Sequence, residues 1–574
     1  MNIFEIFSAK IQNLILANIK ELNLNNLNEF KGIVVETPPE EFNFDLSSNV
    51  GLILGKINKI NPIQLSEKIK LLLINSLPEI NNIEVIKPGF LNINLTNSCL
   101  QNLMLEIFKN RKVYGYSPSN KKYNIEFVSA NPTGPMHVGH CRGAIYGDVL
   151  ANLLKFNGNN VIKEYYINDY GNQIKNFTKS VYLRIREIKY KEKFIDKKDL
   201  YPGEYIKDIA KKIIDNNLQL DFEKFEKFEK ILTKESLKHS MDIIKADLSS
   251  LGIAHDNFFS ESDLVSQNLV SKTIDSLKAN NYVEEGFLNP PKGEEIKNWK
   301  KIKRLIFKSS LFGDDTDRAL QKNDGSWTYF ANDIAYHMNK VSRKYDYLIN
   351  VLGADHTGYI KRITAAVKAL SNNKVKLDCR VCQLVKLYKE GKPFKMSKRA
   401  GDFISANDLL KEVDKDSIRF MMLNRSNDVE LDFDFDKVLE KSKDNPVFYV
   451  QYCYARINSL FRSINLDLTN EIKLDRNNFN LNIYEKNLLR KIFDWPKIIE
   501  ASSKKYEPHR ISFYLYDLAT LFHSYWSKGN EDDKYKFLNK NQIKSTNTLI
   551  IIQLVSIVIL NGMKILGVSL PVKM

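Results

Sequence analysis

Two histidines near the start of a predicted helix are candidates for binding an anion. They are His137 and His140, within the segment NPTGPMHVGH at residues 131–140. The segment follows an apolar strand predicted over Asn124–Ser129 and leads into a helix expected to begin near Cys141. Because backbone N–H groups and the helix dipole favour anions at a helix N-terminus, both imidazoles lie where they can donate to a bound anion.

A lysine-rich segment far along the chain supplies matching cations. Residues 395–398 read KMSK, a short turn that places Lys395 and Lys398 on a loop. The two ammonium groups can meet the same anion from the side opposite the histidines. Such a pair suits attack on the α-phosphorus of a triphosphate, in which negative charge builds on several oxygens. Alone, such a histidine is more often a cap or a surface group, and KxSK is usually a solvated turn.

The two motifs in this order resemble those of the class I aminoacyl-tRNA synthetases, which join an amino acid to AMP and then to tRNA. The segment GADH at 353–356 follows a predicted strand and is expected at the carboxyl edge of the sheet, where ligands bind in such folds. The implied catalytic residues are His137, Gly139, His140, Lys395 and Lys398. The implied ATP-binding residues are Pro132, His137, His140, Gly353, Asp355, His356, Lys395, Met396, Ser397 and Lys398.

Longer segments narrow the resemblance to the arginyl-tRNA synthetases of the bacterial type. DGSWTYFANDIAYHMNK, YYINDYGNQI and VLGADHTGYI are similar to the catalytic domain of that family. KDNPVFYVQYCYARI and YEPHRISFYLYDLATLFHSYW look like its helical anticodon-binding domain, where aromatic and arginine side chains interleave. FNFDLSSNVGLILGK and PGFLNINL look like its N-terminal module. The resemblance therefore covers essentially the whole chain.

Four residues are expected to bind the substrate arginine. A planar cationic guanidinium is best held by carboxylates in bidentate fashion, with an aromatic ring beside it. Tyr329 and Asp333 lie one helical turn apart in WTYFANDIAYH and fit this group. In IEFVSANPTGP, Glu126 is a second carboxylate for the guanidinium, and Asn131 suits the α-ammonium. The same residues could instead form a helix face paired with neighbouring lysines.

Strand–turn–helix units from Tyr123 onward predict an α/β protein. We expect a Rossmann-type catalytic domain with a doubly wound parallel sheet, preceded by an α+β N-terminal module and followed by an all-α bundle. The expected domains are 1–110, a module that reaches the tRNA elbow in the family; 111–402, the catalytic domain, with an insertion at about 171–322; 403–445, a connecting region that contacts the tRNA stem; and 446–574, the anticodon-binding helices.

Charge and cysteine content limit the partners. The net charge of +16 and the pI near 9.2 suit a polyanion such as nucleic acid, although a lysine-rich solvated surface would look the same. The chain has five cysteines, too few and too scattered for a disulfide framework. This cysteine content favours a reducing compartment. Cys379 and Cys382 form a CxxC within a predicted strand, where residues three apart face opposite sides, so no zinc site is expected.

One position departs from a common pattern in the family. Many members lack the second lysine of KMSK and carry a lysine just upstream of the histidine motif instead. Here Lys398 is present, and Gly134 occupies the upstream position. The positive charge is therefore expected to come from one side only.

We expect a cytoplasmic protein with no membrane contact. The chain starts with an amphipathic helical pattern rather than a signal peptide. Its most apolar stretch, Leu549–Leu560, is broken by Gln553 and Ser556 and falls short of the ~20 residues that a membrane span needs.

These observations predict an ATP- and Mg²⁺-dependent ligase that attaches L-arginine to its cognate tRNA through an arginyl-adenylate, for protein synthesis. Mg²⁺ would be bound mainly through the ATP phosphates. The resemblance also implies that activation waits for bound tRNA and that the protein is a monomer without an editing domain. The alternatives are a class I synthetase for another amino acid, a smaller nucleotidylyltransferase, or a non-catalytic tRNA-binding paralogue. The intact motifs disfavour the last.

Overall fold

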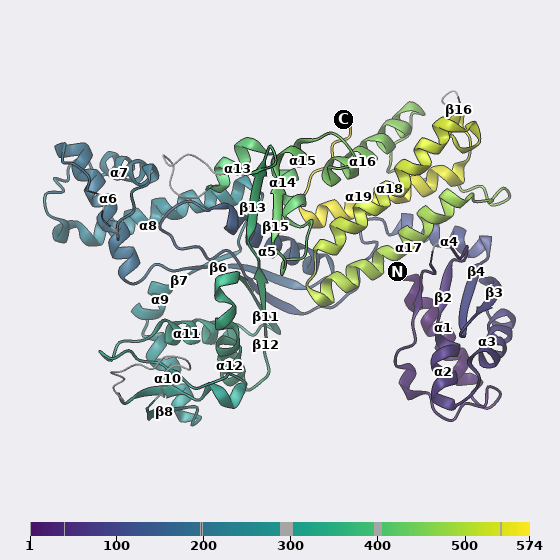
Figure 1. The fold of residues 1–574 in the computed structure, drawn as a ribbon, viewed down its shortest axis with the longest axis horizontal. Helices are drawn as coiled ribbons and strands as arrows, with labels where there is room; N and C mark the ends of the chain where they lie inside the picture. The colour runs from purple at the N-terminus through teal and green to yellow at the C-terminus, as the bar shows by residue number, and fades with distance from the viewer. Residues whose placement is uncertain are drawn as a thin grey trace.

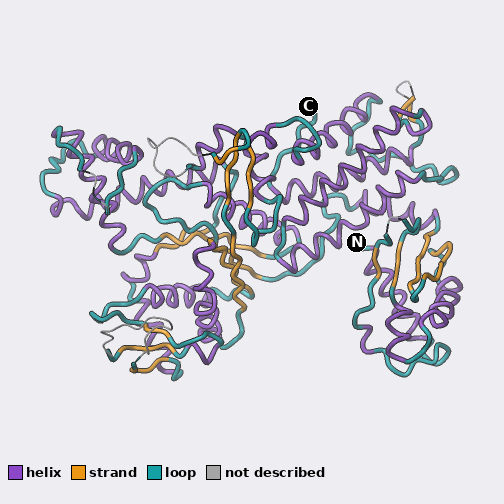
Figure 2. Tube along the Cα trace, viewed as in Figure 1, coloured by secondary structure: helices purple, strands orange, loops and turns teal. Residues whose placement is uncertain are grey.

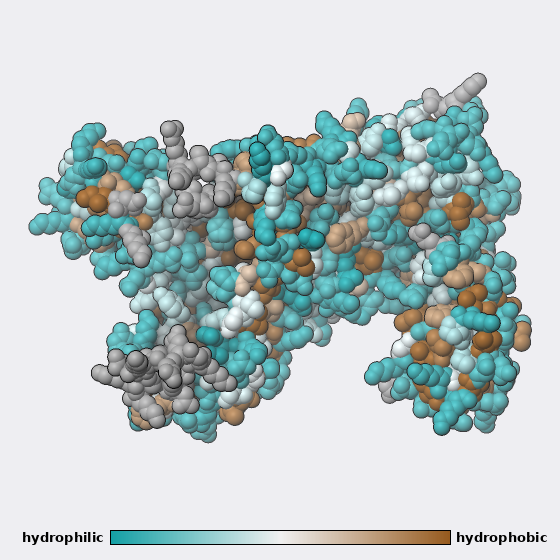
Figure 3. Space-filling view, in the orientation of Figure 1, coloured by the Kyte–Doolittle hydropathy of each residue, from teal (hydrophilic) through white to brown (hydrophobic). Residues whose placement is uncertain are grey.

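The chain is organised around one parallel sheet, with an N-terminal module at the lower right of Figure 1 and a C-terminal helical region at its upper right (Figures 1 and 2). The computed structural model describes residues 2–39, 41–195, 197, 199–287, 302–394, 404–539 and 542–574. On the visible face most residues are hydrophilic, and a group of hydrophobic residues shows on the N-terminal module (Figure 3).

The central sheet has five strands in the order β12-β11-β5-β6-β7, and each neighbouring pair is parallel. The strands are β5 (Lys122–Glu126), β6 (Asn160–Ile167), β7 (Asn257–Ser260), β11 (Tyr347–Gly353) and β12 (Lys376–Cys382). The chain moves outward from β5 to β7 and then returns to β11 on the other side of β5. Strand order therefore reverses between β5 and β11, the place where doubly wound sheets bind ligands.

Helices cover both faces of this sheet. α5 (Val138–Phe156) packs in the core cluster that contains Ile349. α11 (Tyr329–Ser342) and α12 (Ile360–Ser371) pack in a second cluster that contains Leu348. Because successive residues of a strand point to opposite faces, Leu348 and Ile349 enter different cores. The predicted doubly wound α/β architecture is confirmed.

The sequence predicts a single insertion at about 171–322, but the structure divides this segment in two. β7 lies within it and pairs with β6 in the central sheet. A strand of four residues among charged helices leaves little pattern to detect. The strand separates a helical insertion from a second insertion. The helical insertion contains α6 (Asn172–Tyr190), α7 (Glu204–Asn216) and α8 (Phe225–Ser250). The second contains α9 (Glu261–Ser266), α10 (Leu269–Ala279), β8 (Val283–Gly286), β9 (Arg304–Phe307), η2 (Ser309–Phe312) and β10 (Arg318–Ala319).

The N-terminal module is an antiparallel sheet in the order β1-β2-β4-β3, covered by helices. Its elements are α1 (Ile3–Ala17), η1 (Asn28–Phe30), β1 (Val35–Glu36), β2 (Leu46–Ser48), α2 (Val50–Asn58), α3 (Pro62–Ser76), β3 (Ile80–Ile86), β4 (Phe90–Leu95) and α4 (Asn97–Lys109). The Thr37 hydroxyl donates to Asp494 at 2.6 Å, and Arg490 lies 3.6 Å from Asp45. These contacts join the module to the C-terminal helices.

A short connecting region follows the central sheet. β13 (Val385–Lys389) pairs in parallel with β15 (Leu431–Asp434) and antiparallel with β14 (Lys392–Pro393). The helices of this region are α13 (Ala406–Glu412), α14 (Lys415–Met422) and α15 (Phe435–Leu439). The predicted domain borders at 110, 402 and 445 stay predictions.

The C-terminal region is helical apart from one small hairpin, β16 (Leu538–Asn539) with β17 (Gln542–Ile543). Its helices are α16 (Pro446–Ser463), α17 (Ile483–Lys505), α18 (His509–Glu531), η4 (Asp533–Tyr535) and α19 (Thr546–Leu566). α19 is longer than the apolar stretch Leu549–Leu560, with 21 residues and a mean hydropathy of 2.2 over its most apolar window, enough by length and composition alone to cross a membrane. That window is 89% buried inside the protein, as in the core helix of a bundle.

Candidate active site

A cavity of about 270 Å³ opens at the carboxyl edge of the central sheet. It lies at the reversal in strand order, and its walls come from the ends of β5, β6 and β11 and from α9, α11 and α12. It is lined by Glu126, Val128, Ser129, Tyr166, Asn168, Glu261, Tyr329, Asp333, Tyr336, His337, Asn350, Val351, Leu352, Gly353, His356, Tyr359 and Ile363.

Three carboxylates line this cavity, those of Glu126, Asp333 and Glu261. Asp333 accepts a hydrogen bond from the Tyr359 hydroxyl. Burial raises the pKa of Asp333 to about 7, and the charges of Glu126 and Glu261 add to the rise. An added cation would favour the ionised form of this carboxyl group and lower its pKa again. The cavity is therefore suited to a positively charged ligand.

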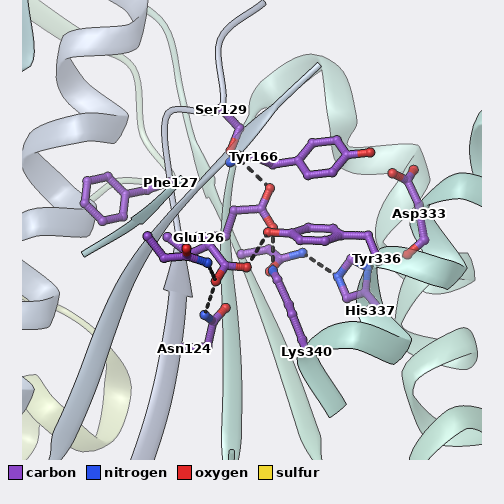
Figure 4. Close-up of polar contacts among 12 residues, drawn as sticks. Asn124, Glu126, Phe127, Ser129, Tyr166, Asp333, Tyr336, His337 and Lys340 are labelled. Carbon is purple, nitrogen blue, oxygen red and sulfur yellow. Dashed lines mark hydrogen bonds and ion pairs between the residues drawn. The ribbon is translucent and has the colours of Figure 1, made fainter. Parts of the chain in front are cut away.

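Glu126 is held by two groups of the protein (Figure 4). Lys340 Nζ lies 2.5 Å from its Oε2, and the Ser129 hydroxyl donates to its Oε1 across 3.1 Å. Lys340 is 0% exposed and also donates to Asn350 Oδ1 at 3.1 Å. The described residues that line the cavity include neither lysine nor arginine. The ammonium of Lys340 therefore balances one carboxylate and leaves a negative excess.

The turn after β5 aims Ser129 back at Glu126. Val128 and Ser129 have φ values of 70° and 41°. A positive φ is an outlier for a β-branched residue and costs on the order of 1–3 kcal/mol. Hydrogen bonds offset this cost, since the Ser129 hydroxyl accepts from Tyr166 N at 3.1 Å and its carbonyl accepts from Asn168 at 3.3 Å. The strand predicted to reach Ser129 ends at Glu126 for this reason.

A buried histidine organises the polar groups beneath the cavity. His337 Nδ1 donates to the Asp333 carbonyl at 2.8 Å, and its Nε2 accepts from Asn350 Nδ2 at 3.0 Å. Burial, together with the charge of Lys340, lowers the pKa of His337 to about 3, so the ring is neutral. Asn350 therefore directs its oxygen to Lys340, which keeps that ammonium beside Glu126.

Three of the four residues predicted to bind arginine line the cavity. Tyr329 and Asp333 lie one turn apart on α11, as predicted, and Glu126 ends β5. Tyr329 is 70% exposed, so its ring lies at the open side. Asn131 is exposed and lies outside the lining. Its contact with the α-ammonium stays a prediction.

Two further residues of the cavity were missed in the sequence. Glu261 is 4% exposed and accepts from Asn332 Nδ2 at 2.9 Å, and burial raises its pKa. It follows β7, whose aromatic pair Phe258–Phe259 was the available signal for a strand end. Tyr359 belongs to the segment VLGADHTGYI, but nothing in the sequence indicates that its hydroxyl reaches Asp333.

His137 caps the helix that carries the histidine motif. The Nδ1 atom of His137 accepts from the backbone N–H of Gly139 at 3.1 Å, and the backbone N–H of His137 donates to His140 Nδ1 at 3.3 Å. This reciprocal cap starts α5 at Val138 rather than near Cys141. The two imidazole rings stack with their centroids 3.7 Å apart. The motif is thus a compact helix N-terminus with two rings side by side.

Both imidazoles are neutral near pH 7. Burial lowers the pKa of His137. Burial, together with the neighbouring imidazole of His137, lowers the pKa of His140 to about 4. Because each Nδ1 accepts a backbone hydrogen bond, each neutral ring carries its proton on Nε2. The motif therefore offers N–H donors to an anion without bringing two imidazolium charges.

The GADH segment meets the histidine motif at the edge of the cavity. Gly353 ends β11, and the next residues form the 3-10 helix η3 (Ala354–Tyr359). Gly353 and His356 line the cavity, and His356 Nε2 lies 3.3 Å from Asp355. The charge of Asp355 also acts on His140, opposing the fall in its pKa. The two segments predicted to bind ATP are therefore neighbours.

The space beside Gly134, just upstream of the histidine motif, is filled by the side chain of a tyrosine from the helical insertion. Tyr205, on α7, donates from its hydroxyl to the Thr133 carbonyl at 2.9 Å. A Cβ at Gly134 would lie 2.9 Å from the Tyr205 hydroxyl oxygen and ring. A lysine at this position would therefore displace Tyr205. Pro132, assigned to ATP, is buried in the same segment.

The four residues of the KMSK segment, Lys395, Met396, Ser397 and Lys398, lie outside the described residues. The chain that follows them is hydrogen-bonded to the histidine motif. Val138 N donates to Ile404 O at 2.9 Å, and Ala406 N donates to Met136 O at 2.8 Å. These bonds bring the chain that leaves the second motif alongside the first.

The fold and this site define a class I aminoacyl-tRNA synthetase. Residues 102–460 match the family described as tRNA synthetases class I (R), catalytic domain. Residues 9–95 match the arginyl tRNA synthetase N terminal domain, and residues 450–574 match the DALR anticodon binding domain.

Individual relatives agree with these matches. An arginine–tRNA ligase from Pelagibacter ubique is 54% identical over 577 residues, covering 100% of both chains. One from Bartonella bacilliformis is 44% identical over 589 residues, again covering 100% of both. The solved arginyl-tRNA synthetase from Thermus thermophilus shares the fold, with a TM-score of 0.71 at 20% identity over 97% of this chain and 100% of that one.

The chain belongs to the arginyl-tRNA synthetase family. Its activity is the ATP-dependent attachment of arginine to tRNA, and the family predicted from the sequence is confirmed.

Proposed function

We propose that the cavity binds the side chain of arginine, with its guanidinium between Asp333, Glu261 and Glu126 and the Tyr329 ring beside it. The negative excess of the cavity and the raised pKa of Asp333 support this assignment. A guanidinium presents its N–H groups in a rigid fork that two carboxylates can meet at once. Lys340 holds Glu126 in place for this contact.

The nucleotide is proposed to lie at the histidine motif, beside the cavity. His137 and His140 would donate from Nε2 to the α-phosphate region, where Pro132 and Gly139 let the backbone come close. Lys395 and Lys398 would approach the pyrophosphate from the other side, and Gly353, Asp355 and His356 would contact the nucleoside. The arginine carboxylate then attacks the α-phosphorus in line, forming the arginyl-adenylate while the bond to the β-phosphate oxygen breaks and pyrophosphate leaves. The protein positions the reactants and stabilises charge, with no proton transfer required.

Mg²⁺ is proposed to arrive on the ATP phosphates. The described residues contain no group of three or more His, Cys, Asp or Glu side chains that could hold a metal ion. Mg²⁺ commonly keeps several waters and binds through substrate phosphates, so this arrangement suits it. When bound, it would neutralise phosphate charge.

The C-terminal helices are proposed to bind unpaired bases of the tRNA. A cavity of about 600 Å³ there is lined by Tyr452, Ala455, Arg456, Ser459, Arg462, Trp526, Lys573 and Met574. The Arg456 guanidinium lies 4.1 Å from the Tyr452 ring centroid and 5.2 Å from that of Trp526. Aromatic faces with nearby cations suit base stacking and phosphate contact. The matched anticodon binding domain covers all of these residues.

We also propose that the protein acts as a cytoplasmic monomer without membrane contact. The burial of α19 supports the last point, because its apolar surface is packed inside the protein.

The experiment that tests the arginine assignment is aminoacylation with purified tRNA and each of the twenty amino acids. Arginine alone should be charged efficiently, and citrulline, an uncharged analogue of similar shape, should compete poorly. Equal charging of lysine or glutamine would overturn the guanidinium assignment. Size-exclusion chromatography with light scattering tests the monomer, and a dimer mass would contradict it.

A further inference from the structure

Tyr166 brings a buried hydroxyl to the cavity proposed for arginine and leaves that hydroxyl unpaired. The residue lies on β6 and lines the cavity, although only 5% of it is exposed. The ring is directed toward Asp333 (Figure 4). Among the described residues, no group forms a hydrogen bond with the Tyr166 hydroxyl. Buried polar groups in folded proteins are nearly always hydrogen-bonded, so an unpaired one at a binding cavity indicates a missing partner.

Two other tyrosine hydroxyls at this cavity have partners within the protein. Tyr336 donates to Glu164 at 2.8 Å, and Tyr359 donates to Asp333. The lack of a partner is therefore specific to Tyr166 and is not a general property of the cavity wall.

The surroundings of Tyr166 hold its ring in place and keep the hydroxyl protonated. The backbone N–H of Tyr166 donates to the Ser129 hydroxyl at 3.1 Å, and the ring packs against Tyr336 with the two centroids 4.3 Å apart. Burial raises the pKa of Tyr166, and the charges of the nearby carboxylates, Asp333 first, add to the rise. The side chain is therefore a neutral phenol, which can both accept and donate a hydrogen bond.

We propose that the Tyr166 hydroxyl accepts a hydrogen bond from the guanidinium of arginine and is a further residue that determines specificity. A guanidinium carries several N–H donors and no acceptor. Each of the three carboxylates of the cavity already accepts at least one hydrogen bond from the protein, so another acceptor helps to satisfy these donors. The phenol can accept this bond while it directs its own proton to a carboxylate. The inference rests on the proposed assignment of the cavity to arginine.

This role predicts that the Tyr166 hydroxyl contributes to arginine binding and not to folding. Deleting a buried hydroxyl that has no partner leaves nothing unsatisfied in the free protein, whereas deleting one partner of a buried hydrogen bond destabilises the fold. A ligand without an N–H group at this position would leave the hydroxyl unpaired, which favours arginine over such a ligand. Stability and substrate use therefore report separately on the hydroxyl.

The test compares Tyr166→Phe with Tyr114→Phe. Tyr114 is the matched control, because it is 2% exposed, lies outside the cavity lining and donates from its hydroxyl to the Ile492 carbonyl at 2.9 Å. Aminoacylation kinetics give KM for arginine and KM for ATP in each variant. Thermal melting of the protein without substrates reports the stability of each fold.

Tyr166→Phe should raise KM for arginine about 10- to 100-fold, the size of one hydrogen bond to a charged group, with KM for ATP nearly unchanged. Its melting temperature should equal or exceed that of the wild type. Tyr114→Phe should show the reverse pattern, a lower melting temperature with KM for arginine nearly unchanged.

A rise in KM for arginine of under about threefold in Tyr166→Phe would overturn the proposal. A melting temperature below that of the wild type would also overturn it, because the hydroxyl would then have a partner within the protein. If Asp333→Asn instead kept the wild-type KM for arginine, the assignment of the cavity to arginine would itself be wrong. The two failures are therefore distinguishable in one set of assays.

Discussion

Arg419 and Asp148 form an ion pair enclosed by three parts of the chain. Arg419 Nη2 lies 2.5 Å from Asp148 Oδ2, and the two side chains are 1% and 3% exposed. Arg419 also donates to the carbonyls of Leu251 and Leu566 at 3.0 Å each. Asp148 lies on α5, the helix of the histidine motif, and Arg419 lies on α14. The pair therefore ties the site helix to the ends of α8 and α19.

Replacing this arginine should destabilise the protein strongly. Arg419→Ala leaves two buried carbonyls without a donor and removes one cation from Asp148, and breaking a buried pair costs about 3–5 kcal/mol. Equilibrium urea unfolding at neutral pH measures the loss. Arg425→Ala, at an exposed position, is the control and should change the unfolding free energy by under about 0.5 kcal/mol. Similar losses for the two variants would contradict this role of Arg419.

Asp333→Asn should impair the use of arginine specifically. The change keeps the shape of the side chain but removes a buried charge from the proposed guanidinium site, so kcat/KM for arginine should fall about 100-fold or more. KM for ATP should change little, because Asp333 lies in the arginine cavity. Asp275→Asn, at an exposed position on α10, is the matched control. A drop shared equally between arginine and ATP would count against a direct contact.

Acidification should weaken arginine use before it protonates His140. The pKa of Asp333 is raised to about 7, so the carboxylate proposed to bind the guanidinium is lost as pH falls through that value. kcat/KM for arginine reports the free enzyme and should fall about tenfold per pH unit below about 7. His140, with its pKa lowered to about 4, does not titrate in this range. The decrease in kcat/KM below about pH 7 should be absent in Asp333→Asn. If the decrease persists in that variant, another group causes it.

Loss of the second lysine of KMSK should slow activation. Lys398→Ala should lower the rate by ~10²–10³-fold, the usual size of losing one transition-state charge contact. Pyrophosphate exchange in the presence of tRNA measures this step. Lys392→Ala, at an exposed position on β14, provides the comparison. A decrease under threefold would remove Lys398 from the proposed clamp.

A methyl group at Gly134 should disturb ATP binding through Tyr205. Gly134→Ala places a Cβ 2.9 Å from the tyrosine, and overpacking of this kind costs about 1–3 kcal/mol. We expect KM for ATP to rise about tenfold. The double variant Gly134→Ala with Tyr205→Ala should recover much of the loss, because the space is then open. No recovery in the double variant would place the cause elsewhere.

Much of the fold and part of the site could be predicted from local pattern. The apolar strand before Asn131 and the one-turn spacing of Tyr329 and Asp333 are short-range features, and both were found. Family resemblance then supplied the order of the domains. Such signals are local because the residues of one strand or one helix face lie within a short stretch of the chain.

Other features depend on contacts that no local pattern contains. Lys340 lies on the buried face of α11, where the helical pattern predicts an apolar residue. Its contact with Glu126 depends on the tertiary fold. Glu261 enters the cavity because the short strand β7 joins the sheet. The contact of Tyr205 with Gly134 joins residues from two different units. These are tertiary relationships, and the sequence alone could not place them.

The bond from Asn152 Nδ2 to Ile565 O, 3.3 Å long, joins residues 413 positions apart. On a ribosome adding about 5–20 residues per second, α5 would therefore wait roughly 20–80 s for the helix that covers it. During that interval the nascent chain exposes the apolar surface of its catalytic domain that α19 later covers. Chaperones that shield such surfaces should matter more for the yield of this protein than for one built from sequential, self-contained units.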